Sequence, residues 1–263
     1  MNCALNMIPI KSQKDIEKMR AVNRLVALTH AEIEKHIAVD VTTKELDKVA
    51  HDFIIKHGAR PNFYKYRGYP ASSCISVNEV VIHGIPSYRT LADGDIVSVD
   101  LGAVLDGFHG DMARTYAVGS ISNNAKSLIQ VTKDCFYEGL KECRAGRRVG
   151  DISNAIQKHA EKFGYGVVRQ FCGHGIGRRL HEDPAVANFG ASGTGTLLKA
   201  GYCLAIEPMI NEGSFNVTID SDGWTVRTAD GKLSAHYENV VLITNDEPEI
   251  LTQYKGVKTY DKN

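Results

Sequence analysis

The stretch DIVSVDLGAVLDGFHGDMARTYAV, residues 95–118, decides the fold. Two β-rich runs flank the pair Asp106-Gly107, which is a strong signal for a two-residue hairpin turn. Residues equidistant from this turn face each other across the hairpin, so Asp100 is expected opposite Ala113. Asp111 then lies diagonal to Asp100 on the same face of the ladder, with Cα atoms about 7–8 Å apart.

Two carboxylates on one face of an apolar strand pair are costly when they are bare. Val97, Val99, Leu101 and Val104 make the surroundings of this pair apolar. Each carboxylate would lose its hydration there and repel the other. A shared cation removes that cost, so the pattern favours a metal site. The alternative is that one aspartate faces solvent while the other caps a turn.

Apolar periodicity predicts four helices, over 13–37, 42–58, 122–146 and 151–164. Thr42 with Glu45 three residues later is a capping box, and Gly58 is typical of a helix stop. Strand-like runs cover 74–82, 95–105, 108–118, 202–210 and 236–243. Because helices and strands do not alternate strictly, this order predicts an α+β fold rather than a parallel βαβ arrangement.

A weak internal repeat links the two halves of the chain. Residues 91–100 read LADGDIVSVD and residues 198–207 read LKAGYCLAIE, so each has Leu, then Gly at the fourth position, then an apolar run that ends in a carboxylate. Two related halves would bring Asp100 and Glu207 together at a pseudo-twofold centre. Coincidence between two degenerate strand patterns is the alternative explanation.

Three further residues fit a metal site together with the two aspartates. His174 lies in the glycine-rich FCGHGIG, Glu207 ends an apolar run, and Glu238 lies inside the strand-like SAHYENVVLI. Each alone could be a hydrogen-bonded or ion-paired structural residue. The whole set has no thiolate, which disfavours a structural zinc site. Oxygen-rich sites suit Mn²⁺, Fe²⁺, Co²⁺ or Zn²⁺ in two-metal hydrolases, whose ions lie about 3.5–4 Å apart.

Composition excludes several classes of protein. The 263 residues carry no net charge, which gives no general attraction to nucleic acid or to an anionic membrane. None of the six cysteines has C-x-x-C spacing, and scattered thiols fit a reducing compartment better than a disulfide framework. The N-terminus is a poor signal peptide, and no apolar run reaches the roughly 20 residues of a membrane helix. We therefore expect a cytoplasmic enzyme.

Several motifs resemble those of type I methionine aminopeptidases, which have the pita-bread fold: VNEVVIHGIP, VSVDLGAVLDGFHGDMARTY, CGHGIG, HEDPAV, IEPM and YEN. The resemblance extends from the first helix to about residue 252. It implies two pseudo-related αβ halves around a central antiparallel sheet, in agreement with the repeat. We expect a single catalytic domain over 13–253, with halves at about 13–145 and 146–253. An N-terminal extension (1–12) and a C-terminal tail (254–263) flank it.

The resemblance also implies two divalent metal ions, which could be Co, Mn, Fe or Zn. By this resemblance Asp111 and Glu238 bridge the two ions and Asp100 binds the first. His174 and Glu207 bind the second, and Glu207 would also shuttle a proton.

Substrate contacts are implied in the same way. His83 in IHGIP corresponds to the family residue near the substrate amine and the scissile amide. His181 in LHEDP corresponds to the residue that stabilises the scissile carbonyl. The pocket for the methionine side chain would be lined by Tyr66, Tyr69, Cys74, Leu180 and Trp224.

The chain departs from the family pattern at three positions. Asn239 follows the last ligand where the family commonly has His, Ile82 stands where Cys is often found, and Leu180 replaces a frequent aromatic residue. None of these changes removes a ligand. They bear on the rate and on the shape of the pocket rather than on the reaction.

The implied activity is removal of the initiator methionine from nascent proteins whose second residue is small. Its partners would be nascent N-termini, with possible transient ribosome contact, and the enzyme is expected to be a monomer. An Xaa-Pro aminopeptidase or prolidase is one alternative, although these usually carry a large N-terminal domain, for which a helix that starts near residue 13 leaves no room. A non-catalytic pita-bread binding protein is another, although such proteins lose metal ligands and all five are present here.

Overall fold

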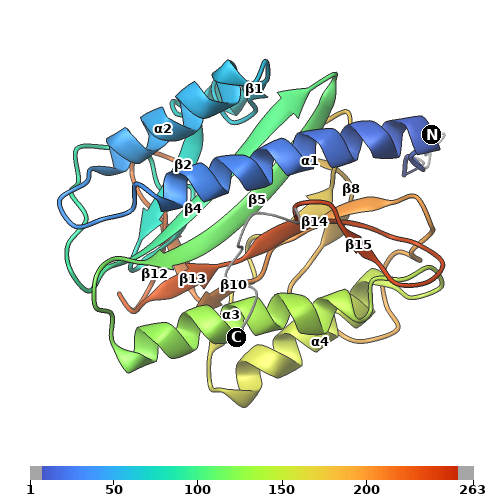
Figure 1. Ribbon diagram of the computed structural model, residues 1–263. Helices are drawn as coiled ribbons and strands as arrows, with labels where there is room; N and C mark the ends of the chain where they lie inside the picture. The colour runs from blue at the N-terminus through green and yellow to red at the C-terminus, as the bar shows by residue number, and fades with distance from the viewer. Residues whose placement is uncertain (1–7, 254–263) are drawn as a thin grey trace.

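The computed structural model describes residues 8–253, which form four helices packed on a nine-stranded sheet. Figure 1 shows α1 crossing β4 and β5, with α2 beside it, while α3 and α4 lie together along the other half of the sheet. None of the helices in the described part of the chain is long and apolar enough to span a membrane. The helices are α1 (Gln13–Glu34), α2 (Thr43–Lys56), α3 (Asn123–Leu140) and α4 (Val149–Lys162), with a 3₁₀ turn η1 at Tyr66–Gly68.

The main sheet has the order β1-β4-β5-β14-β9-β7-β8, with β2 also on β4 and β15 also on β14, and its ladders are antiparallel. Two small sheets lie beside it, β13-β10-β6 and β11-β12-β3. The strands are β1 (Arg60–Pro61), β2 (Ser73–Val77), β3 (Val80–Ile82), β4 (Ile96–Leu105), β5 (Phe108–Ala117), β6 (Gly166–Val167), β7 (Gly173–Gly175), β8 (Glu182–Val186), β9 (Cys203–Ile206), β10 (Met209–Asn211), β11 (Val217–Ile219), β12 (Val226–Thr228), β13 (Ser234–His236), β14 (Glu238–Leu242) and β15 (Glu249–Ile250).

The predicted hairpin is confirmed in its register. Asp100 lies opposite Ala113, and Asp111 lies opposite Gly102. Asp106 has a φ of 50° and Gly107 a φ of 77°, as a type I′ turn requires at both central positions. The two aspartates are therefore diagonal neighbours on one face of the β4–β5 ladder.

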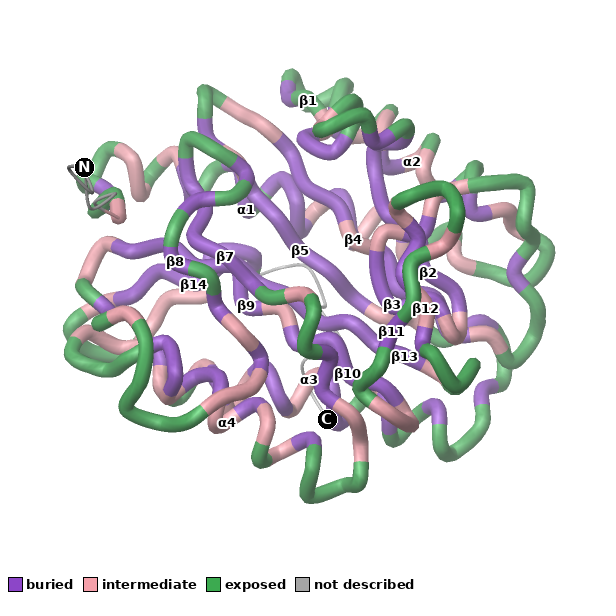
Figure 2. The backbone as a smooth tube through the Cα atoms, turned by 180° about the vertical axis from the view of Figure 1, so that it is seen from behind, coloured by how far each residue is buried: buried purple, intermediate pink, exposed green. Residues whose placement is uncertain are grey.

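The internal repeat corresponds to a symmetric arrangement at the middle of the sheet. The hairpin β4–β5 from the first half of the chain lies beside the pair β14–β9 from the second half, in the order β4-β5-β14-β9. Each half has its own hydrophobic cluster, one under α1 and α2 and the other under α3 and α4. Figure 2 shows these central strands as an almost continuous buried layer with exposed loops around it.

Three predicted strands are each divided in two by an irregular residue. The run 74–82 breaks at Asn78, whose φ is 57°, and its two pieces join different sheets. The run 202–210 breaks at Glu207-Pro208, because proline has no N–H to donate to a ladder. The run 236–243 breaks at Tyr237, and the strand-forming residues extend two positions further toward the N-terminus. Apolar strand composition alone does not reveal such breaks.

The helix boundaries differ from the predicted ones by a few residues at most ends and by six at one. The first helix ends at Glu34, and the fourth begins at Val149. The third helix ends at Leu140 rather than 146, because the backbone beyond it turns to the sheet: the Ala145 N–H donates to the Thr244 carbonyl at 2.9 Å. Thr42 caps α2 as predicted, with Glu45 completing the capping box. The expected C-terminal tail and residues 1–7 of the N-terminal extension lie outside the described residues.

Candidate metal centre and active site

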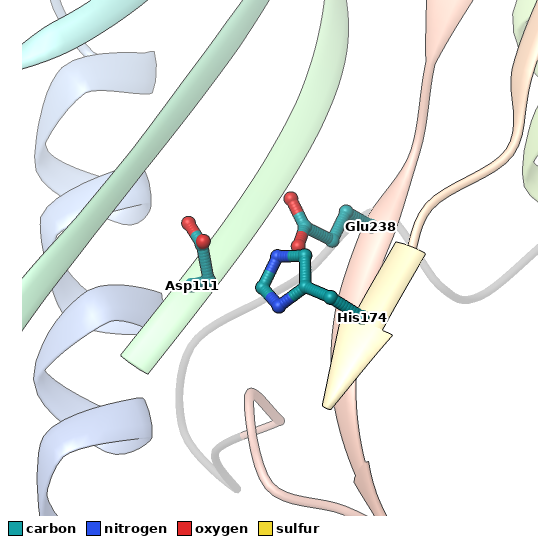
Figure 3. A group of neighbouring side chains, drawn as sticks. All are labelled: Asp111, His174 and Glu238. Carbon is teal, nitrogen blue, oxygen red and sulfur yellow. The ribbon is translucent and has the colours of Figure 1, made fainter. Parts of the chain in front are cut away.

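Three strands bring Asp111, His174 and Glu238 together in the middle of the sheet. Their ligand atoms all lie within 4.8 Å of one another, and all three residues are buried. Figure 3 shows the carboxylates and the imidazole converging from β5, β14 and β7 on one point. These strands are adjacent or nearly so in the sheet, so the fold itself fixes the geometry of this group.

The other two predicted ligands adjoin this group. Asp100 shares a row across the strands with Glu238, because both lie opposite Ala113. Glu207 follows β9 directly, and its Oε1 atom lies 3.6 Å from Nε2 of His174. The structure thus places four carboxylates and one imidazole in one cluster.

The carboxylates of this cluster are poorly satisfied by protein groups alone. Among the described residues, no hydrogen-bond partner is found for Oδ1 of Asp100, Oδ1 of Asp111 or Oε1 of Glu238, and all three atoms are buried. A buried carboxylate oxygen without a partner is costly, and a cation would satisfy all three at once. The donor set therefore fits divalent metal ions.

Electrostatics lead to the same conclusion. Burial raises the pKa of Asp100 to about 7 and the pKa of Glu207 to about 8. Burial also raises the pKa of Asp111 and of Glu238 well above their usual range, and the neighbouring carboxylates add to both shifts. Without a cation these groups resist ionisation, so binding a metal ion at neutral pH would displace protons from them.

His174 is held in the tautomer that a metal ligand needs. Its Nδ1 atom lies 2.9 Å from the Gly175 carbonyl oxygen, which can only accept, so Nδ1 carries the proton and donates. Nε2 is then unprotonated and faces the carboxylates. Burial lowers the pKa of His174 to about 3, which keeps the ring neutral. A hydrogen bond from the second nitrogen that orients the ring is common for metal-binding histidine.

The two predicted catalytic histidines lie beside this cluster. The His181 ring is 4.3 Å from the His174 ring, centroid to centroid, and it is exposed. The His83 ring makes edge contacts with Phe171 and Trp224. His83 has a φ of 58°, a strained backbone conformation for a residue with a side chain, and burial lowers its pKa to about 4.

The five predicted pocket residues belong to one hydrophobic cluster. Tyr69 and Trp224 meet edge to face at 5.1 Å between ring centroids. Cys74 pairs with Asp100 across β2 and β4, which joins the cluster to the carboxylates. The members of the set are Tyr69, Cys74 and Leu180, which are buried, and Tyr66 and Trp224, which are partly buried against them.

Comparison with known proteins identifies the family. Residues 17–245 match the model of metallopeptidase family M24. A methionine aminopeptidase of Clostridium perfringens is 52% identical over 249 residues, which cover 95% of this chain and 100% of that one. The crystal structure of methionine aminopeptidase from Rickettsia prowazekii superposes with a TM-score of 0.93 at 46% identity, covering 94% of this chain and 100% of that one.

The chain belongs to the methionine aminopeptidases of metallopeptidase family M24. Membership in a metallopeptidase family implies bound metal ions, in agreement with the cluster of unsatisfied carboxylates. A prolidase from Pyrococcus furiosus has a TM-score of 0.77 at 21% identity, covering 94% of this chain and 66% of that one. That likeness shows the shared pita-bread fold alone.

One residue of this methionine aminopeptidase site was missed by the sequence analysis. His236 lies two residues before Glu238, and its buried Nε2 atom is 3.7 Å from Oε2 of Glu207 with no hydrogen-bond partner among the described residues. Burial lowers its pKa to about 4. The period-two spacing of His236 and Glu238 in a strand-like run is the signal that could have found it.

Asn239, the departure after the last ligand, has a defined role in the structure. Its Oδ1 atom accepts hydrogen bonds from Arg114 at 2.6 Å and from Thr252 at 2.8 Å. The Arg114 guanidinium also donates to the Glu238 carbonyl oxygen at 2.6 Å and stacks on the Tyr237 ring at 3.9 Å. Arg114 and Asn239 together therefore hold the backbone that carries Glu238.

Proposed function

We propose that this chain is a metal-dependent methionyl aminopeptidase that removes the N-terminal methionine from proteins whose second residue is small. The observation that carries the proposal is the convergence of five ligand-type side chains in a chain that is 52% identical, over almost its whole length, to a methionine aminopeptidase. The central cluster supports a hydrolase, because buried carboxylates without partners are typical of a site built for cations.

Two divalent metal ions, Co, Mn, Fe or Zn, are proposed for this cluster. Asp111 on β5 and Glu238 on β14 come from strands that lie between those of the remaining ligands, and they would contribute to both ions. Asp100 would complete one site, and His174 with Glu207 would complete the other. When bound, such ions lower the pKa of water and polarise the substrate carbonyl.

Glu207 is the proposed proton shuttle of the reaction. Its carboxylate lies beside the imidazoles of His174 and His236. A carboxylate in this position can accept a proton and return it, as a general base and then a general acid do. We infer that Glu207 takes a proton from the attacking water and delivers it to the leaving amine.

The two rim histidines are proposed to act on the scissile bond. His181 is exposed beside the cluster, where its imidazole can donate a hydrogen bond to the substrate carbonyl oxygen. His83, which makes edge contacts with Phe171 and Trp224, is proposed to contact the substrate amine and the amide. Partial desolvation of the ring and the nearby cation of Arg67 lower the pKa of His181, so it donates as a neutral ring.

Substrate choice follows from the proposed pocket. The cluster of Tyr66, Tyr69, Cys74, Leu180 and Trp224 offers aromatic and soft side chains that suit a flexible thioether. The second residue would pass close to the Gly173–Gly175 strand, which supports a preference for Gly, Ala or Ser. A Cβ at Gly173 or Gly175 would collide with neighbouring backbone, so the chain is already closely packed there.

The cellular setting is part of the same proposal. We infer one catalytic domain over 13–253 that acts as a monomer in the cytoplasm on nascent N-termini, with transient contact to the ribosome. An Xaa-Pro peptidase is the second candidate, because the pita-bread fold by itself does not separate the two activities.

The test is hydrolysis of Met-Ala and Ala-Pro peptides by the chelator-treated protein, with and without added Mn²⁺ or Co²⁺. We expect Met-Ala cleavage that depends on the added ion. Cleavage of Met-Ala in excess chelator at the full rate would contradict the metal centre.

A further inference from the structure

Tyr66 makes a short contact with one of the two rim histidines. Its phenolic oxygen lies 2.7 Å from Nδ1 of His181, and the two ring centroids are 5.4 Å apart. This contact joins the loop before β2 to the loop between β7 and β8, two segments 115 residues apart in the chain. A neutral imidazole carries one proton, on either of its two ring nitrogens. The hydrogen-bond partner of Nδ1 therefore decides whether Nε2 carries the proton and can donate it to the substrate.

The chemistry of the two groups decides the direction of this hydrogen bond. A phenol is a better donor than acceptor, and an unprotonated imidazole nitrogen is a better acceptor than a phenolic oxygen. The tyrosine O–H therefore donates to Nδ1, and the ring proton of His181 resides on Nε2. A hydrogen bond in this direction needs an unprotonated Nδ1, so it belongs to the neutral ring of His181.

The same pairing occurs a second time in this molecule, with its direction fixed independently. His30 has Nδ1 3.1 Å from the Tyr116 hydroxyl and Nε2 2.8 Å from the Met112 carbonyl oxygen. A carbonyl only accepts, so Nε2 of His30 carries the proton and the tyrosine donates to Nδ1. His30 thus has the tautomer inferred for His181, but it is buried and directs its N–H to the backbone.

The loop that carries Tyr66 has a costly backbone conformation. Lys65 and Arg67, on either side, have φ values of 65° and 49°, in the left-handed region that side chains disfavour. The Lys65 N–H donates to the Tyr69 carbonyl at 2.9 Å, which closes the turn. Such strain persists where the surroundings impose it, and it is frequent at functional sites. Here it coincides with the placement of the Tyr66 hydroxyl on His181.

We propose that Tyr66 is a positioning residue that holds His181 in the tautomer with the proton on Nε2, so that this N–H is available to the substrate carbonyl oxygen. The inference rests on the proposed function, in which His181 stabilises that carbonyl. It adds to that function a second task for a residue that would otherwise only line the methionine pocket. Without the tyrosine hydroxyl, His181 would divide its proton between the two nitrogens.

The direct test is nitrogen-15 NMR of the histidine side chains in zinc-loaded protein, which is diamagnetic. In the wild type we expect a protonated-type Nε2 and an unprotonated-type Nδ1 for His181, like those of His30. Tyr66→Phe should move both His181 resonances toward the average of the two types and leave His30 unchanged. Tyr64→Phe, which removes an exposed hydroxyl two residues away, is the control and should change neither ring.

A kinetic measurement distinguishes positioning from pocket lining. Tyr66→Phe keeps the ring, so we expect kcat on Met-Ala to fall about tenfold, the value of one neutral hydrogen bond, with little change in KM. In a His181→Ala background the same change should have no further effect on kcat, because the two residues act together.

Different results would reject the positioning role of Tyr66 and the proposed peptidase function. A wild-type His181 with the proton on Nδ1, or a Tyr66→Phe protein with unchanged His181 resonances, would overturn the positioning role while leaving the peptidase function in place. Equal effects of Tyr66→Phe with and without His181 would also overturn it. Absence of Met-Ala cleavage by the wild type would instead reject the proposed function, whatever the tautomer.

Discussion

At the scale of single residues, Glu207 is expected to affect turnover strongly, because it is the proposed proton shuttle. Glu207→Gln keeps the size and one oxygen donor but removes the base, so we predict that kcat on Met-Ala falls by about 10²–10⁴-fold. The exposed Glu247→Gln is the matched control and should retain full turnover. Steady-state kinetics on both variants would measure kcat. Near-normal turnover of Glu207→Gln would remove this residue from the mechanism.

Arg114 allows a second prediction at this scale. Arg114→Met removes the side-chain donor to the buried Glu238 carbonyl and one of the two donors to Oδ1 of Asn239. We expect the free energy of unfolding to fall by about 2–4 kcal/mol, because unsatisfied buried acceptors pay their full desolvation cost. Arg20→Met, which breaks an exposed pair with Glu249, is the control and should cost less than about 1 kcal/mol. Urea denaturation measures the free energy of unfolding of both variants. Equal losses would refute a stabilising role for the buried hydrogen bonds of Arg114.

Single residues also show the reach of sequence analysis. The clustering of Asp100, Asp111 and Glu238 could be predicted because a carboxylate inside an apolar strand-like run needs a partner. His236 was missed because a histidine in such a run is often a satisfied core residue. Arg114 could not be assigned, since its acceptors lie on a strand more than a hundred residues away.

At the scale of elements, the β4–β5 hairpin sets the position of both aspartates. A Cβ at Gly102 would overlap the Gly110 carbonyl oxygen and the Asn62 side chain. We predict that Gly102→Ala lowers the free energy of unfolding by about 1–3 kcal/mol, the usual cost of overpacking, and weakens metal binding. Asp106→Asn keeps a turn residue that tolerates positive φ and should change neither quantity.

Urea denaturation and calorimetric titration of Mn²⁺ test this pair of variants. If Gly102→Ala bound metal and unfolded like the wild type, the close approach of the strands at this position would have no importance for the site.

The hairpin also shows which elements could be predicted. Its register followed from a two-residue turn signal, because turn length fixes the pairing. Pro208 predicts the break in the run 202–210, whereas the divisions of the runs 74–82 and 236–243 could not be foreseen in the same way. They occur where the chain passes from the main sheet to a small one, and that passage depends on contacts between distant segments.

At the scale of the whole molecule, metal binding and stability should be linked through pH. In the metal-free protein the pKa of Asp100 is raised from 3.8 to about 7 and that of Glu207 from 4.5 to about 8. The unfolded chain therefore loses these protons first as pH rises. Stability of the metal-free protein should fall between about pH 4 and pH 8, with no further loss from these groups above that range.

Added metal should reverse this trend, because it binds the ionised folded state. We predict a larger rise in Tm on adding Mn²⁺ at pH 8 than at pH 5, measured by thermal scanning at equal ion concentration. The same scan with Asp111→Asn is the control and should show a much smaller rise at both values. A rise that does not depend on pH would contradict the raised carboxyl pKa values.

Removal of N-terminal methionine by this molecule can be measured with a peptide panel, as kcat/KM with added metal. The panel contains Met-Ala, Met-Leu, Leu-Ala and Ala-Pro at the N-terminus of one common sequence. We predict that Met-Ala is cleaved best, that a large second residue or a leucine in first place lowers kcat/KM, and that Ala-Pro is cleaved poorly. Faster cleavage of Ala-Pro or Leu-Ala than of Met-Ala would contradict it, even with every metal ligand correctly assigned.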